Sequence, residues 1–260
     1  MPRGWAAWAV VATMRDGRPA YDAAVSPART EWPVVAGTEA WRPMAFGAKN
    51  ASRIKNPICE PLWGGARVLV EVSDGAVRIR DVDGERVPGF NELEAAIAGA
   101  ATASELVLDG YMLPAPLRDL IDDAILAGVG DTPTSGQMAR QMMLGGLGRN
   151  RRQEQLEDAN ARRVELAPSE PAAFVATDLL WLDGQALIDI PLGERKRLLD
   201  SVLTDVELVR RTVTVRLPIE PWYRQWRAFG FREFAVKDAN SRYIPGGASD
   251  QWTTAPIPKR

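Results

Sequence analysis

The chain has 260 residues, of which 46% are hydrophobic and 25% charged, and its formal net charge is −2. This length and composition predict a globular protein with one large domain or two small ones. The small net charge predicts no general attraction to nucleic acid or to anionic membranes, although a local basic groove is compatible with it. No uninterrupted apolar stretch is long enough to span a membrane, so we expect a cytoplasmic protein without a membrane partner.

Histidine is absent from the sequence, and Cys59 is its only cysteine. These two facts exclude disulfides within the chain, zinc sites made of thiolates or imidazoles, and catalytic triads or dyads that need histidine. Chemistry would have to come from carboxylates, hydroxyls, arginine, lysine or an oxygen-bound metal. Lysine occurs only at positions 49, 55, 196, 237 and 259, which gives five candidates for an amine nucleophile. We expect Cys59 itself to be a buried, inert thiol.

The first part of the chain shows weak periodicity until about residue 66. Residues 1–57 are predicted to form an irregular N-terminal segment that packs on a core domain of residues 58–260, with one early strand in WAAWAVVATM. The stretch ARVLVEV, the turn SDG, and the stretches AVRIRDV and DGERV then predict a hairpin or meander, because Asp-Gly stands at both reversals.

A helix and a strand are expected next. NELEAAIAGA has helical spacing, and ELVLDGYML predicts a buried strand that runs into an Asp-Gly turn. PLRDLIDDAILAG predicts an amphipathic helix that ends at glycine. Residues 128–170, which include the Met-rich tract 138–147 and then a charged run, predict a partly helical excursion that could be mobile.

The C-terminal part alternates between the two kinds of element. AAFVATDLLWLDG predicts a strand with a turn, PLGERKRLLDSVL a helix, RRTVTVRL a strand, EPWYRQWRAFGF a short amphipathic helix and REFAVKD a last strand. We expect Trp222, Tyr223 and Trp226 in the core, with a base-stacking platform as the alternative. Since strands outnumber helices and most connections resemble hairpins, the sequence predicts an α+β domain built on antiparallel sheet.

Residues 60–67, EPLWGGAR, form a glycine-rich turn before a strand. Adjacent glycines let a backbone approach a ligand closely, yet after Glu60 the turn has no lysine, carboxylate or hydroxyl. In isolation the simpler interpretation is a structural turn, with Trp63 in the core.

Four stretches in order change that interpretation: EPLWGGAR, then ELVLDGY, then FVATDLLWLDG with PLGERKRLLDSVL, then REFAVKDANSRYIPGGASDQW. Together they resemble the adenylation domains of ATP-dependent DNA ligases, in particular the bacterial end-joining type, over about residues 58–252. The resemblance implies a ligase-type, ATP-grasp-like nucleotidyltransferase fold of two antiparallel sheets flanked by helices, and a context of DNA repair or recombination. We expect no oligonucleotide-binding barrel after this domain.

The departures from the family pattern fall on its functional positions. In the family a lysine attacks the α-phosphate of ATP and carries AMP, and that position is Leu62, which has no lone pair. Other family residues are replaced as well: the motif aspartate by Gly64, the glutamate after Leu-Asp-Gly by Tyr111, the adenine-stacking phenylalanine by Thr177, the metal-side glutamate by Arg232, and two closing lysines by Thr254 and Pro256. We expect the chemistry to be lost and Mg²⁺ not to bind, because the guanidinium of Arg232 stays protonated.

Other family positions are retained, which makes ATP a candidate ligand. By the resemblance, Glu60 approaches adenine, Arg67 reaches the ribose and Lys237 contacts the α-phosphate, and Asp109 and Asp178 are also kept. If Arg67, Arg232 and Lys237 point inward, they form a small basic pocket for phosphate or a nucleic-acid backbone. The alternative for Arg232 and Lys237 is a solvated strand position.

Three functions are compatible with this pattern. The preferred one is an inactive module that binds nucleic-acid ends, a nucleotide or a repair protein. The second is a divergent ligase that uses Lys55 or Lys49 and a barrel from another chain, but a straight strand would separate Lys55 from Leu62 by roughly 23 Å. The third is a structural scaffold subunit. The sequence predicts neither the partner nor the oligomeric state.

Overall fold

The computed structural model describes residues 35–115, 157, 159–160, 165–168 and 170–258, together with β1 (Met14–Arg15) and β2 (Arg18–Pro19). The chain divides into two compact units, Met1–Trp32 and Pro33–Arg260. In the first unit β1 and β2 pair antiparallel. Three predicted features lie wholly or mostly outside the described residues: the strand in WAAWAVVATM apart from Met14, the helix PLRDLIDDAILAG, and the excursion 128–170 with its Met-rich tract 138–147.

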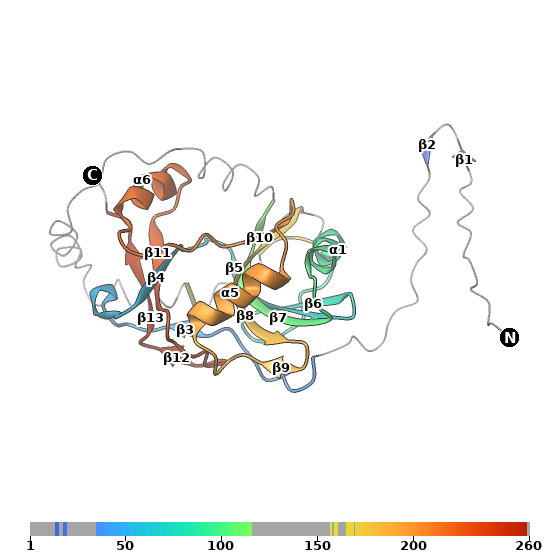
Figure 1. Cartoon of the computed structure of the whole chain (residues 1–260). Helices are drawn as coiled ribbons and strands as arrows, with labels where there is room; N and C mark the ends of the chain where they lie inside the picture. Colours follow the sequence, from blue (N-terminus) through green and yellow to red (C-terminus); the bar gives the residue numbers. More distant parts are fainter. Residues whose placement is uncertain are drawn as a thin grey trace. The chain divides into compact units, whose positions relative to one another are not determined.

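The larger sheet of the second unit has the strand order β10-β8-β7-β5-β6, with β9 paired to β8 (Figure 1). All its neighbours run antiparallel except β10, which is parallel to β8. The strands are β5 (Ala66–Ser73), β6 (Ala76–Arg80), β7 (Glu105–Pro114), β8 (Ala172–Leu182), β9 (Gln185–Ala186) and β10 (Val209–Arg211).

A smaller antiparallel sheet has the order β13-β11-β4. It consists of β4 (Pro57–Pro61), β11 (Glu233–Asp238) and β13 (Trp252–Pro256). A short parallel pair, β3 (Ala45–Phe46) with β12 (Ala248–Ser249), and the 3-10 turn η1 (Ala51–Arg53) complete this part of the unit. The predicted α+β class on antiparallel sheets is confirmed.

The described helices of known bounds are α1 (Asn91–Ala100), α5 (Leu192–Val202) and α6 (Glu220–Ala228). Helices α1 and α5 contribute to one apolar cluster on one face of the larger sheet, and α6 packs on the smaller sheet (Figure 1). Tyr223 and Trp226 of α6 are buried against Phe234 of β11, so the expected core role of the two rings is confirmed. None of the described helices is both long and apolar enough to cross a bilayer.

The alternation of side chains along β5 directs Arg67, the arginine of the motif turn, toward the smaller sheet. Successive residues of a strand point to opposite faces. Val68 and Val70 join the cluster under α1 and α5, whereas Leu69 packs with Ala235 and Trp252 of the smaller sheet. Residues of odd number on β5 therefore face the smaller sheet.

Two predicted strand ends are wrong. Strand β7 continues through Asp109 and Gly110 where a turn was expected, and a register shift against β8 occurs at that point. The predicted strand RRTVTVRL is a strand only at its start, in β10. The rest of the stretch crosses between sheets, because Thr212 N–H donates to Ala176 O and Val215 bridges to Cys59 in the smaller sheet.

The described part of the N-terminal segment, residues 35–57, contributes to the core. Val35, Met44 and Phe46 belong to the apolar cluster between the sheets, and Ala51 and Ile54 to the cluster under α6.

Candidate functional site

The motif turn connects the two sheets. Glu60 lies near the end of β4 in the smaller sheet, and Arg67 near the start of β5 in the larger one. At Gly65 the backbone passes close to β7, and a Cβ built there would lie 2.1 Å from the carbonyl oxygen of Met112. This glycine is therefore explained by backbone packing, without a ligand.

Leu62, the position of the family nucleophile, has an apolar environment. Its partly buried side chain packs against a cluster that contains Trp63, Tyr111 and Val175. Trp63 is buried, as expected, and its Nε1–H donates to Thr212 Oγ1 at 3.0 Å. Two replaced family positions, 62 and 111, thus meet in one hydrophobic cluster.

Cys59, just before the motif, is buried, as predicted. Burial raises the pKa of its thiol to about 12, and the neighbouring Glu60 carboxylate adds to the rise. The thiol is therefore protonated at neutral pH, which makes it a poor nucleophile.

Arg67 forms a two-point ion pair with Asp109 inside the core. Its Nε–H lies 2.7 Å from Asp109 Oδ1, a second N–H donates to Oδ2, and the two side chains are 2% and 0% exposed. Asp109 also accepts a hydrogen bond from the Tyr243 hydroxyl at 2.8 Å. Burial alone would lower the pKa of Arg67, but the Asp109 carboxylate outweighs it and raises this pKa well above its ordinary value.

Aromatic rings surround the Arg67 guanidinium. Its central carbon lies 5.4 Å from the ring centroid of Phe46, 5.5 Å from that of Tyr111 and 5.9 Å from that of Trp252. These distances permit cation–π attraction. The arginine that reaches a ribose in the family is therefore held here by the molecule's own carboxylate and rings.

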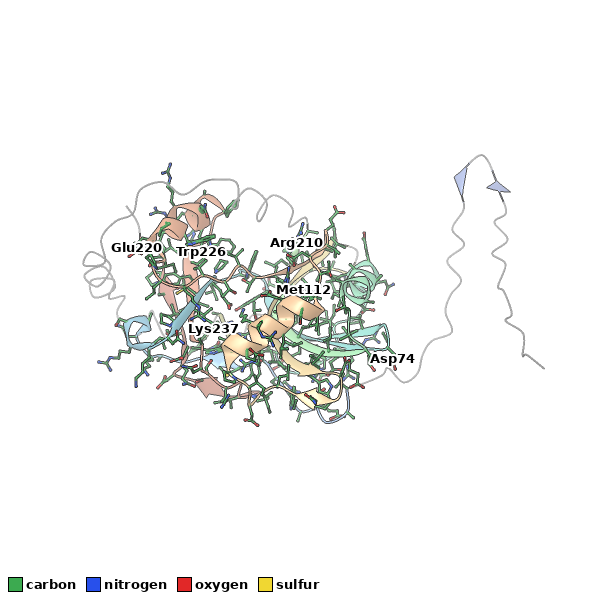
Figure 2. All side chains as sticks on the ribbon, in the orientation of Figure 1. Asp74, Met112, Arg210, Glu220, Trp226 and Lys237 are labelled. Atoms are coloured by element: carbon green, nitrogen blue, oxygen red, sulfur yellow. The ribbon has the colours of Figure 1, made fainter. Side chains whose placement is uncertain are left out.

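Glu60 binds two lysines. Lys237 Nζ lies 2.9 Å from Glu60 Oε2, and Lys196 Nζ from α5 pairs with Oε1. All three residues are buried, and Figure 2 shows Lys237 on β11 beside α5. Lys237 Nζ also lies 4.2 Å from the ring centroid of Trp252. Lys237 is thus a buried residue and not a solvated one.

The pKa values in this group shift because of burial and mutual charge. Burial would raise the pKa of Glu60, but Lys196 and Lys237 outweigh it, so this pKa is lowered. Burial lowers the pKa of Lys237, and the nearby cations Lys196 and Arg67 add to the fall although Glu60 opposes it. The protein thus favours an ionised Glu60.

Asp178, retained from the family, is paired with Arg195 of α5. Arg195 Nε and Nη2 lie 2.9 and 2.7 Å from the two carboxylate oxygens, and both side chains are fully buried. The backbone carbonyl oxygens of Ile190 and Ser241 accept further hydrogen bonds from Arg195. With Asp178 tied in this way, each carboxylate retained from the family has an internal cation.

Sequence reasoning missed Arg195 and Lys196. The signal was present, because Leu192, Arg195, Lys196 and Leu199 follow the i, i+3, i+4, i+7 spacing of a buried helix face. Two cations on such a face require buried partners. We call the seven side chains Glu60, Arg67, Asp109, Asp178, Arg195, Lys196 and Lys237 the buried charge network. Its four cations and three carboxylates leave a formal excess of one positive charge.

The other replaced positions differ in burial. Thr177 is buried, and its hydroxyl donates to the carbonyl oxygen of Asp109 at 3.1 Å. Thr254 is buried on β13, whereas Gly64 and Pro256 are exposed.

Arg232 lies just before β11, and its side chain is exposed. The expected inward grouping of Arg67, Arg232 and Lys237 is therefore not found, because only Arg67 and Lys237 are buried. Arg67 and Lys237 can be buried because each pairs with an internal carboxylate, Asp109 and Glu60 respectively. Within the described part of the chain, no salt bridge joins Arg232 to a carboxylate.

Comparison with known proteins agrees with the motifs and the fold. A family model described as "ATP dependent DNA ligase domain" matches residues 140–254. The chain is 27% identical over 195 residues to the "Multifunctional non-homologous end joining protein LigD" of Mycolicibacterium smegmatis, covering 74% of this chain and 20% of that protein. It is also 27% identical over 217 residues to a "DNA ligase" of Thermococcus fumicolans, covering 81% of this chain and 35% of the relative.

Among solved structures, the ligase domain of Mycobacterium tuberculosis LigD superposes with a TM-score of 0.55 at 22% identity, over 84% of this chain and 60% of the other. A mycobacterial DNA ligase D solved with ATP and MES gives a TM-score of 0.54 at 22% identity, over 83% of this chain and 60% of the other. The nucleotidyltransferase fold is thereby confirmed. The chain spans about a fifth to a third of the length of these curated relatives. These matches confirm the resemblance to the adenylation domains of ATP-dependent DNA ligases that the motifs predict.

Proposed function

We propose that this chain is a non-catalytic ligase-like module of DNA repair, which binds its partner without forming an adenylate. The observation that carries the proposal is the environment of Leu62. A side chain of carbon and hydrogen cannot attack a phosphorus atom, and Leu62 packs among apolar side chains that include Trp63 and Tyr111.

The buried charge network supports the same proposal. Arg67 and Lys237, which contact the nucleotide in the family, are bound here to Asp109 and Glu60. A nucleotide would have to displace at least one of these buried carboxylates. Breaking a buried ion pair by removal of one partner costs about 3–5 kcal/mol, a large fraction of a domain's stability.

The residues present do not fit a magnesium-bound nucleotide. The family acids are replaced at Gly64, Tyr111 and Arg232. Asp109 and Asp178 direct both of their oxygens at arginine. Among the residues that the structure describes, no group of three or more acidic or cysteine side chains is arranged to hold a metal.

The rival proposal, an active enzyme with a substitute lysine, has little geometric support. Lys55 is exposed and precedes β4, whereas Leu62 follows that strand, so the strand's length separates them. Lys49 lies still earlier, before η1. Lys196 and Lys237 lie in the buried charge network, and either would have to leave Glu60 before it could act.

The context of DNA repair comes from the relatives' names, one of which specifies non-homologous end joining. We propose DNA ends or a repair protein as the partner, in the cytoplasm. A scaffold role without any nucleic acid is the second candidate.

Incubation with α-labelled ATP and magnesium, followed by denaturing electrophoresis, tests the proposal. A covalent adenylate survives denaturation, so the expected result is no label on the protein. Labelled protein would contradict the proposal, and peptide mapping of the label would identify the lysine that carries it. An active ligase in a parallel reaction controls for the reagents.

A further inference from the structure

We propose that the surface around η1 and α6 binds the phosphodiester backbone of nucleic acid, at a place separate from the old nucleotide site. We call it the α6 face and define it by six cations: Arg53, Lys55, Arg216, Arg224, Arg227 and Arg232. The inference rests on the proposed function, because a module without chemistry must act by binding.

The charge on this part of the chain differs from that of the whole. Residues 50–57 and 212–232 contain the six cations and one carboxylate, Glu220, which leaves an excess of five positive charges. The complete chain has a net charge of −2. A local positive field of this kind attracts polyanions even when the net charge is negative.

Described contacts bring the two segments together. Arg216 donates to Asn56 Oδ1 at 3.2 Å, which places it beside Lys55. One apolar cluster contains Ala51 of η1 and Trp226 of α6, so these elements share a core. Figure 2 shows Glu220 and Trp226 on α6, at the end of the smaller sheet.

The other end of the face is joined through the C-terminal residues. Arg227 donates to the carbonyl oxygen of Pro258 at 2.6 Å, and Ile257 N–H donates to the carbonyl oxygen of Arg232. Arg224 lies one helical turn after Glu220 on α6 and three residues before Arg227.

The cations of the α6 face are available to a partner. Five of them are exposed and Arg227 is half-buried. Within the described part of the chain no salt bridge joins any of the six to a carboxylate, in contrast to the internally paired cations of the buried charge network. Glu220 lies in the same segments, and no salt bridge within the described ranges joins it to any of the six cations.

The side-chain types favour phosphate and nucleic acid. Five of the six cations are arginine, whose planar guanidinium binds two phosphate oxygens at once. Trp222 and Phe231, which are only partly buried, border the face. Aromatic rings beside arginines can stack on unpaired bases. An acidic peptide has no bases to stack, so this pairing of residue types favours nucleic acid.

The experiment is fluorescence anisotropy with a labelled blunt duplex and a labelled single strand of the same sequence, over a range of salt concentrations. The variants are Arg224→Glu and Arg232→Glu, both exposed. The control is Arg197→Glu, which makes the same charge change at an exposed position of α5, where Arg197 pairs with Glu194. Circular dichroism melting confirms that all four proteins are folded.

We expect each α6-face variant to weaken binding by roughly tenfold at moderate salt and to reduce the salt slope by about one, because one phosphate contact is lost. The control should bind as the wild type does. Equal weakening by all three variants, or wild-type binding that does not depend on salt, would overturn the inference. Binding of an acidic peptide, without binding of the duplex or the single strand, would also overturn the inference.

The inference and the proposed function fail in different ways. Adenylate label on the protein contradicts the proposed function and leaves the DNA-binding result unchanged. Undiminished binding by Arg224→Glu and Arg232→Glu contradicts the α6 face alone.

Discussion

Arg67 on β5 and Asp109 on the neighbouring strand β7 form a two-point ion pair in the core, and Asp109 accepts a third hydrogen bond from Tyr243. In the family, Arg67 reaches a ribose. Here the same side chain joins two strands of the larger sheet to the segment that carries Tyr243. The structure thus gives Arg67 a structural role within the core.

The first prediction concerns this pair. Asp109→Asn keeps the shape of the side chain but leaves the buried guanidinium of Arg67 without a countercharge, and we expect a loss of about 3–5 kcal/mol in the free energy of unfolding. Urea denaturation measures it. In the double variant Arg67→Met/Asp109→Leu, where neither charge remains, much of the loss should disappear. A loss below about 1 kcal/mol in Asp109→Asn, the value of an exposed pair, would contradict the structural role of the pair.

The second prediction concerns pH and Glu60. Since the folded state lowers the pKa of Glu60, the stability from its ionisation is present above the ordinary value of 4.5 and is lost as the pH falls through the lowered folded pKa. Glu60→Gln should remove this contribution. The variant should be less stable at neutral pH and should lose less stability than the wild type on acidification below 4.5. Urea denaturation at a series of pH values measures both effects, and parallel curves would contradict the assignment.

The third prediction concerns the close contact of β7 and β8. A Cβ at Gly110 would lie 2.3 Å from the carbonyl oxygen of Val175 and 2.5 Å from the Phe174 ring, so Gly110→Ala must displace backbone and should destabilise the fold by more than about 2 kcal/mol. Gly99→Ala in α1 is the matched control, because a Cβ there meets no atom within 4 Å. It should stabilise the protein by up to about 1 kcal/mol, since alanine favours helix. Thermal melting that shifts equally in both variants would contradict the contact.

The fourth prediction concerns the lost nucleophile. Leu62→Lys restores an amine, and its partly exposed position lets the ammonium reach water while the methylenes pack on the apolar cluster. We expect the variant to fold and to form no adenylate, because Gly64, Tyr111 and Arg232 still replace the family acids. Labelling of this variant with α-labelled ATP would show that the nucleophile alone had been missing.

Local patterns in the sequence predicted the elements whose structure depends on local residues. The helix NELEAAIAGA has the expected bounds in α1, and PLGERKRLLDSVL contains α5. Asp-Gly predicted a turn at positions 109–110, but Gly110 lies inside β7, because tertiary packing against β8 decides its conformation. Turn propensity cannot reveal such a contact.

The site was predictable in part. Motif order singled out Glu60, Arg67, Asp109, Arg232 and Lys237; the structure buries four of them and leaves Arg232 exposed. Their partners were not identified, because pairing across two sheets and α5 is a tertiary property. The sequence signal for this pairing was the position of Arg195 and Lys196 on the same face of α5 as its buried leucines.

The most direct measurement of the central claim is the intact mass of the wild-type protein after incubation with ATP and either magnesium or manganese. The claim is that, among the residues that the structure describes, no amine is both free and placed to receive AMP where Leu62 stands. It predicts an unchanged mass with both metals. A stable mass increase equal to one AMP, located by peptide mapping on any of the five lysines, would contradict it.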